Sequence, residues 1–106
     1  DFDSKFGHRR DVSGYANAIE EFDKRLPEIL KLTGDNDLLL ITADHGCDPT
    51  WKGTDHTREH VPALFFSKKT SSKNLGFLST FADMGATISN HLKTPALKNG
   101  VVCNLW

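Results

Sequence analysis

The stretch "ITADHGCDPTWKGTDHTREH", residues 41–60, turns from apolar to polar within a few positions. It starts at the end of the apolar run Leu38–Thr42, a pattern typical of a strand buried on both faces of a parallel sheet. Residues 44–60 show no periodicity and predict a long loop. Loops of this length inside a compact domain are usually functional or disordered, and the composition of this one favours function. We therefore expect the chemistry of the protein to lie in this loop.

Two amphipathic helices are predicted on either side of it. Apolar residues recur at three- and four-residue spacing from Asp11 to Thr33, with Asp11 as the N-cap and Gly34 as the stop. Pro27 inside this pattern predicts a kink. Thr80–Asp83 has the spacing of a capping box, and the helix that follows is expected to end before Thr94–Pro95.

The predicted strands alternate with these helices. We expect "DFD" at residues 1–3 to end one strand, residues 61–67 to form a second buried strand and "GVVCNLW" at residues 100–106 a short final one. This order predicts an α/β fold with an open, mainly parallel sheet flanked by helices. Ligands gather at the carboxyl ends of strands in such sheets, so Asp3 and Asp44-His45 should share one rim.

Length and composition limit the class of protein. The 106 residues allow one domain, and the net charge of −1 gives no electrostatic reason to expect a nucleic acid or a membrane as partner. Cys47 and Cys103 lack metal-finger spacing, so we expect no disulfide framework and a cytoplasmic location. The chain begins without Met, and we expect it to be part of something longer.

Five side chains form a candidate metal constellation, because carboxylate and neutral imidazole are ligands for cations of the manganese or zinc type. They are Asp3, His8, Asp44, His45 and His56. Each alone is more simply a turn former or a solvated loop residue. Together they exceed the needs of one ion and suit two ions about 3.5–4 Å apart, if another ligand is added. Gly46 should free the backbone so that Asp44 and His45 both reach the rim.

Other residues of the right type fit a metal site less well. His60 follows His56 by four residues, but a predicted strand begins there rather than a helix turn. Cys47 is a soft ligand among hard ones. His91 lies late in the second helix and is most simply a cation that complements the helix dipole.

Three motifs in this order carry a family resemblance: "DFDSKFGHRRD", "ITADHGCDP" and "GTDHTREHVPALFF". With them the chain resembles, over essentially all 106 residues, the C-terminal part of the phosphopentomutase family, within the alkaline phosphatase superfamily of two-metal phosphoryl-transfer enzymes. "TADHG" alone is shared with cofactor-independent phosphoglycerate mutases, whereas "GHRRD" with "DHTREHVP" favours the pentomutases. Residues 1–106 would then be a C-terminal segment of the metal-binding core, a partial alkaline-phosphatase-like core.

The resemblance implies two divalent metal ions, most simply Mn²⁺. Asp3, His8 and His56 would bind one ion, and Asp44 and His45 the other. The family completes the second site with an aspartate from its first strand, and its nucleophile is a threonine that becomes phosphorylated. Neither element matches a position in this chain, nor does the family's cap domain, and Thr54 and Thr57 do not match the nucleophile's motif. We therefore expect this chain alone to be inactive.

The implied substrates are ribose 1-phosphate, ribose 5-phosphate and their deoxy counterparts, which interconvert through a bisphosphate. Candidate phosphate contacts are the basic residues near the motifs: Lys5, Arg9, Arg10 and Arg58. The alternative for the arginines is structural pairing, of Arg9 or Arg10 with Asp11 and of Arg58 with Glu59 or Asp55.

Two other functions stay open. One is another enzyme of the superfamily, a phosphoglycerate mutase or a metal-dependent phosphohydrolase, which the reaction product would distinguish. The other is a non-catalytic chain that self-associates through an exposed sheet edge, which sedimentation would detect.

Overall fold

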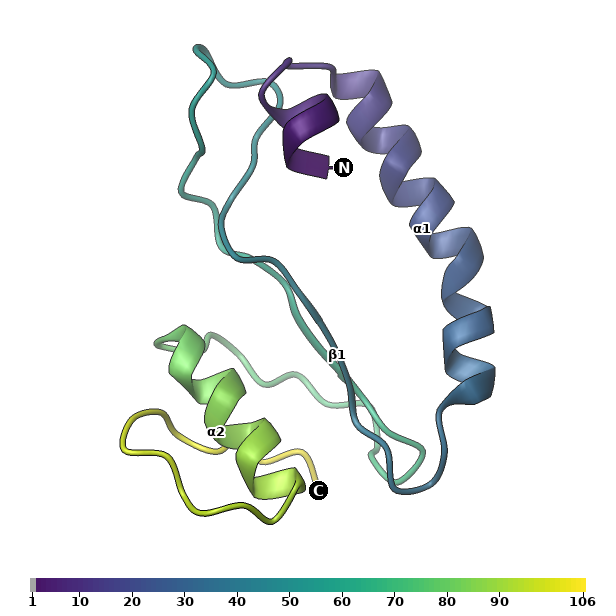
Figure 1. Ribbon diagram of the computed structural model, residues 1–106, viewed down its shortest axis with the longest axis vertical. Coiled ribbons are helices and arrows are strands. Elements are labelled where there is room, and N and C mark those ends of the chain that lie inside the picture. Colours follow the sequence, from purple (N-terminus) through teal and green to yellow (C-terminus); the bar gives the residue numbers. More distant parts are fainter. Residues whose placement is uncertain (1) are drawn as a thin grey trace. The chain divides into compact units, whose positions relative to one another are not determined.

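The computed structural model describes residues 2–106. Its elements, in chain order, are η1 (Phe2–Gly7), α1 (Val12–Leu32), β1 (Leu39–Thr42), β2 (Ala63–Phe66) and α2 (Phe81–His91) (Figure 1). They fall into two compact units. The first unit holds the chain up to Leu32 with Thr42–Pro62, and the second holds Thr33–Ile41 with Ala63–Trp106. In the described part of the chain, no helix has the length and apolar character needed to cross a membrane.

The first predicted helix is confirmed as α1. The Asp11 carboxylate accepts a hydrogen bond from the Gly14 amide at 2.8 Å, as an N-cap does. Pro27 lies inside the helix. None of the residues of α1 is buried, and Ile19 is 51 % exposed. The apolar face that the sequence predicts is therefore present but not covered within the first unit.

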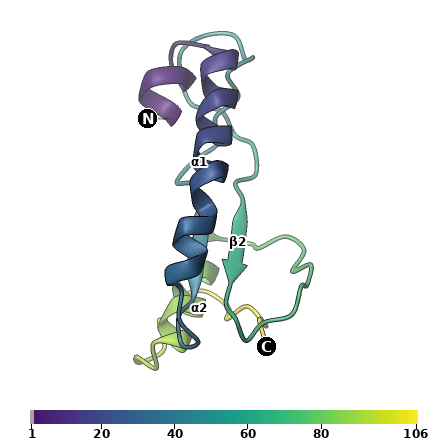
Figure 2. The same ribbon diagram turned by 90° about the vertical axis from the view of Figure 1, so that its right-hand side faces the viewer.

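The expectation that "DFD" ends a strand is wrong. Residues Phe2–Gly7 form a single turn of π-helix, η1, which packs beside the N-terminal part of α1 (Figure 2). The His8 amide donates to the Asp3 carbonyl and the Asp11 amide to the Phe6 carbonyl, each at 3.0 Å. These bonds span five residues, so the backbone is wound where an extended strand was predicted. Asp3 and His8 consequently lie on one tight turn.

The two central strands form where the sequence predicts them, but their pairing is not the expected one. β1 and β2 make a two-stranded antiparallel sheet, so an open, mainly parallel sheet is not confirmed. The physical reason is the connection: a parallel pair needs a crossover, usually a helix, whereas here the chain returns through an irregular loop. Both strands are also less buried than predicted, and Leu64 on β2 is 58 % exposed.

The second predicted helix and its cap are confirmed. Thr80 is the N-cap of α2 and forms a capping box with Asp83. Five residues of this helix are buried, among them Met84 and Ala86. Leu105 is buried as well, at 6 % exposure, in the same unit.

The final strand predicted at residues 100–106 is absent from the structure, which describes this segment without strand pairing. Its amides bond to side chains of α2 instead. The Val101 amide donates to the Asp83 carboxylate and the Cys103 amide to the Thr87 hydroxyl, each at 2.9 Å. The segment is therefore fixed to a helix rather than to a neighbouring strand.

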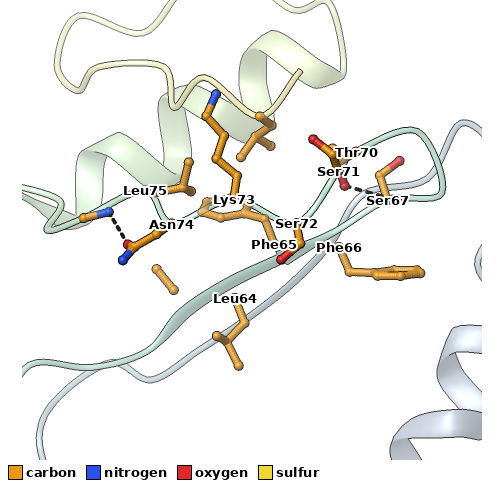
Figure 3. A pocket seen from close by; sticks show the side chains of 13 residues that line it. Leu64, Phe65, Phe66, Ser67, Thr70, Ser71, Ser72, Lys73, Asn74 and Leu75 are labelled. Carbon is orange, nitrogen blue, oxygen red and sulfur yellow. Dashed lines mark hydrogen bonds between the residues drawn. The ribbon is translucent and has the colours of Figure 1, made fainter.

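A hollow of about 550 Å³ lies in the second unit, between β2 and the segment 70–76, with Leu105 on its wall (Figure 3). Its polar lining comes from hydroxyls, Asn74 and Lys73. The Lys73 ammonium donates to the Asn104 carbonyl at 2.9 Å. Among the residues that the structure describes, no histidine, cysteine or carboxylate lines this hollow.

Candidate metal centre

Three of the five predicted ligands meet in the first unit. One ligand atom each from Asp3, His8 and His56 lies within 4.8 Å of the other two. Both imidazoles face the same carboxylate oxygen: Nε2 of His8 is 3.3 Å and Nε2 of His56 is 3.5 Å from Asp3 Oδ2. Ligands at about 2.0–2.2 Å from one ion stand roughly 3–3.5 Å apart. The two distances from Asp3 Oδ2 to the imidazoles match this spacing.

The tautomer of His8 also suits a metal. Its Nδ1 is hydrogen bonded to the Thr54 carbonyl, which only accepts, so Nδ1 carries the proton. In the neutral ring with this tautomer, Nε2, the nitrogen that faces Asp3, carries the lone pair. Ligating histidines commonly donate their other ring N–H to a carbonyl in this way, which fixes the ring orientation.

His45 lies next to this group, whereas Asp44 does not point into it. The rings of His45 and His56 stack with centroids 3.7 Å apart. His45 Nδ1 bonds the Gly46 carbonyl at 2.9 Å, and its Nε2 is 3.7 Å from the Asp44 carboxylate. The Asp44 side chain is 90 % exposed. His45 is therefore part-buried beside the first group, whereas Asp44 is open to solvent, and the binding of an ion by this pair stays a prediction.

The pKa of His45 is raised above its ordinary value. The hydrogen bond to the Gly46 carbonyl is the main cause, and the negative charges of Asp44 and Asp3 act in the same direction. Partial burial opposes them. The His45 ring therefore takes up a proton more readily than a free imidazole does.

Gly46 is required for a reason that the sequence did not indicate. It forms an isolated antiparallel bridge with Thr57, which brings the two arms of the 44–60 loop together. A Cβ on Gly46 would lie 2.6 Å from both the Thr57 carbonyl oxygen and the Glu59 nitrogen. A glycine therefore permits the close approach that brings His45 to His56.

A hydroxyl network orders the same loop. Thr57 Oγ1 accepts from the Asp48 amide at 2.7 Å and donates to Glu59 Oε2 at 2.6 Å. The Asp48 carboxylate accepts from both the hydroxyl and the amide of Thr50, and these bonds lower its pKa. Thr57 thus has a structural role, and Thr54 contributes its carbonyl to His8.

The predicted phosphate contacts stay predictions, but the structure describes what Arg10 touches. Its three nitrogens donate to carbonyls of the loop, those of Gly53, Asp48 and Asp55. The structural pairing considered for Arg9 and Arg58 is not seen among residues 2–106. Nothing in the sequence pattern signalled the Arg10 contacts, because carbonyl acceptors belong to every residue type.

The less suitable candidates lie outside the group of three. His60 is not one of its members within the described residues. Cys47 is free and lies beside Tyr15, whose pKa is raised by burial and by this thiol. His91 is in the last turn of α2, as the dipole interpretation expects, with its ring stacked 6.2 Å from that of Trp106.

Comparison with known proteins agrees with this chemistry. A profile of the Metalloenzyme superfamily matches residues 1–96. Among curated proteins, the chain is 58 % identical over 100 residues to phosphopentomutase of Vibrio cholerae serotype O1 (strain ATCC 39315 / El Tor Inaba N16961), covering 94 % of this chain and 25 % of that one. Phosphopentomutase of Serratia proteamaculans (strain 568) is 56 % identical with the same coverage. That of Psychromonas ingrahamii is 59 % identical over 93 % of this chain and 24 % of its own length.

The chain belongs to the Metalloenzyme superfamily, and this membership implies the use of divalent metal ions. It spans about a quarter of the length of the curated relatives that it matches.

Proposed function

We propose that this member of the Metalloenzyme superfamily is the C-terminal segment of a phosphopentomutase core, with residues 1–106 supplying most of the metal ligands. The observation that carries the proposal is the convergence of His8 Nε2 and His56 Nε2 on one oxygen of Asp3. An identity of 56–59 % to phosphopentomutases supports it. The whole protein would interconvert ribose or deoxyribose 1-phosphate with the 5-phosphate.

Two divalent ions, most simply Mn²⁺, would be held at this place. Asp3, His8 and His56 would bind one, and Asp44 and His45 would bind the other together with an aspartate from outside this chain. When bound, such ions stabilise charge on the transferring phosphoryl oxygens and align the attacking and leaving oxygens. The Thr54 carbonyl would hold the His8 ring in its ligating tautomer.

The phosphorylated threonine and the cap would also lie outside residues 1–106, so we propose that this chain alone is inactive. Phosphate contacts would come from the ammonium of Lys5 or the guanidinium groups of Arg9 and Arg58, because both kinds of cation bind phosphate and a guanidinium can do so through two parallel hydrogen bonds. We further propose a cytoplasmic enzyme of nucleoside metabolism without nucleic acid or membrane partners. The outer edges of β1 and β2 are the candidate surface for self-association.

A chimera tests this function directly. The matched 100 residues of the Vibrio cholerae enzyme, which are 58 % identical, are replaced by those of this chain. ³¹P NMR then follows ribose 1-phosphate in the presence of Mn²⁺. We expect ribose 5-phosphate to form, and His56→Ala in the chimera to abolish its formation. Release of free phosphate instead would identify a phosphohydrolase, and an inactive but folded chimera would contradict the proposal.

A further inference from the structure

We propose that Arg10 is a positioning residue that clamps the 48–55 loop and thereby sets the metal affinity of Asp3, His8 and His56. The inference rests on the proposed metal site and assigns Arg10 a task other than phosphate contact. Its evidence is a set of hydrogen bonds between segments some forty positions apart in the chain.

The clamp is built from one planar side chain and three main-chain carbonyls. Nη1 donates to the Asp48 carbonyl at 2.8 Å and Nη2 to the Asp55 carbonyl at 2.6 Å, while Nε donates to the Gly53 carbonyl. Carbonyls of an irregular loop have no ladder partner and need donors from elsewhere. A guanidinium has donors on three nitrogens in a rigid fork, whereas a lysine ammonium is a single point.

The clamped carbonyls adjoin the metal-type residues on both segments. Arg10 lies two positions after His8, and Gly53 and Asp55 flank Thr54, whose carbonyl accepts from the His8 ring. His56 comes next in the chain. The clamp and the ligands therefore share one loop and one turn. A shift of Asp55 would displace His56, and a shift of Thr54 would release His8.

The backbone at Arg10 gives a second observation. Its φ is +54°, in the left-handed region that glycine adopts more readily, and its amide donates to the Gly7 carbonyl at 3.0 Å. Arg10 lies in the turn between η1, which ends at Gly7, and α1, which begins at Val12. A side chain at such a position is held by its surroundings, and here those surroundings are the three carbonyls.

The same contacts separate this role from phosphate binding. Nε, Nη1 and Nη2 each donate one N–H to a loop carbonyl, and these three bonds turn the guanidinium toward the loop, although each Nη keeps a second N–H. A phosphate-binding Arg10 would affect substrate affinity, whereas a clamp affects ion affinity without any substrate present. Metal titration of the substrate-free chain distinguishes the two.

The experiment compares Arg10→Lys and Arg10→Gly with the unchanged chain, using Mn²⁺ alone as the probe. Arg10→Gly suits the positive φ, so its effect isolates the guanidinium from backbone strain. Arg25→Lys is the matched control, because Arg25 bonds Glu28 on the exposed surface of α1. Electron paramagnetic resonance measures free Mn²⁺. Hydrogen exchange without metal measures the order of the loop at the hydrogen-bonded amides of Asp48, Thr50 and Thr57.

We expect both Arg10 variants to bind Mn²⁺ about 10–100-fold more weakly, as loss of an outer partner of a metal ligand typically does. Added guanidinium at concentrations far below denaturing should partly restore binding by Arg10→Gly. Loop amides should exchange faster in both variants, and Arg25→Lys should change neither readout. Unchanged Mn²⁺ affinity in both Arg10 variants would overturn the inference. If the unchanged chain binds no Mn²⁺, the metal-site proposal fails. If, in addition, the loop amides of both Arg10 variants exchange at the rate of the unchanged chain, the clamp itself is overturned.

Discussion

The two units of the molecule are organised by different interactions. In the first, hydrogen bonds order the turn at Asp3–Arg10 and the loop that leads to His56, while α1 buries none of its residues. In the second, α2 buries five residues, and the buried hydrophobic side chains among residues 2–106 (Met84, Ala86 and Leu105) all belong to it. A candidate site can therefore be arranged by polar contacts in a unit that contributes little hydrophobic core.

Substitutions in the two units should therefore have separable effects. A change at the polar site of the first unit should alter ion binding and leave the unfolding of α2 nearly unchanged. A change in the core of the second unit should lower the free energy of unfolding without altering ion binding. Substitutions at distant sites that share no partners usually act additively.

The largest effect is expected from Asp3→Asn. Both imidazole nitrogens face the Asp3 carboxylate, and an amide lacks the charge that attracts a divalent cation. We expect Mn²⁺ affinity to fall by at least about 100-fold, the upper end for loss of an outer partner, since a ligand itself is removed. Paramagnetic resonance of free Mn²⁺ measures the change. Asp23→Asn on α1 is the control, and equal affinity in the two variants would contradict the prediction.

Next in size is Met84→Ala in the second unit. Met84 is 7 % exposed, and truncation of a buried methionine leaves a cavity. We expect the free energy of unfolding to fall by about 2 kcal/mol, the low end for such truncations because so few neighbours are buried. Urea denaturation followed by circular dichroism measures it. Ile88→Ala on the same helix, at 39 % exposure, should have a smaller effect.

Acid should weaken the second unit through Asp83. Its carboxylate accepts from the amides of Val101, Thr80 and Ser79, and these bonds lower its pKa. Because the folded pKa lies below the unfolded one, the stabilisation is present above about pH 4 and is lost as pH falls through the folded value. Asp83→Asn should reduce stability at neutral pH and flatten this acid dependence. If the stability of the unchanged chain and that of Asp83→Asn fall in the same way as pH decreases, Asp83 is not the group that causes the acid dependence.

The smallest effect is expected from Thr80→Ala. Thr80 is the N-cap of α2 and accepts from the Ala82 amide at 3.3 Å. Loss of a threonine cap typically reduces stability by about 1 kcal/mol. Thr80→Ser keeps the hydroxyl and should restore most of it in the same urea titration. An alanine variant as stable as the unchanged chain would show that Asp83 alone fixes this end of the helix.

Local signals allowed the helices to be predicted from the sequence. Three- and four-residue spacing, the Asp11 cap and the Thr80–Asp83 capping box all recur in the structure, because each acts within one helical turn. Strand pairing depends on contacts between segments far apart in the chain, and it was not predicted correctly from the sequence. An apolar run does not indicate which segment it pairs with. The predicted parallel sheet and the predicted final strand at residues 100–106 are therefore not found in the structure.

The residues of the candidate site were easier to predict than the backbone conformation and main-chain contacts that bring them together. Asp3, His8 and His56 followed from their chemistry and from family motifs, although Asp3 lies on a π-helical turn rather than at a strand end. The Arg10 contacts and the close approach at Gly46 were missed. Both involve main-chain atoms, which are the same in every residue, so the sequence does not indicate these contacts.

A calorimetric titration with Mn²⁺ is the most direct test of a metal site at Asp3, His8 and His56. It compares the unchanged chain with His56→Ala and with the control His91→Ala. His91 lies in the second unit, on α2. We predict saturable binding by the unchanged chain, strongly weakened by His56→Ala and unaffected by His91→Ala. A sample folded by circular dichroism that binds no ion, or that loses binding equally in both variants, would contradict a metal site at Asp3, His8 and His56.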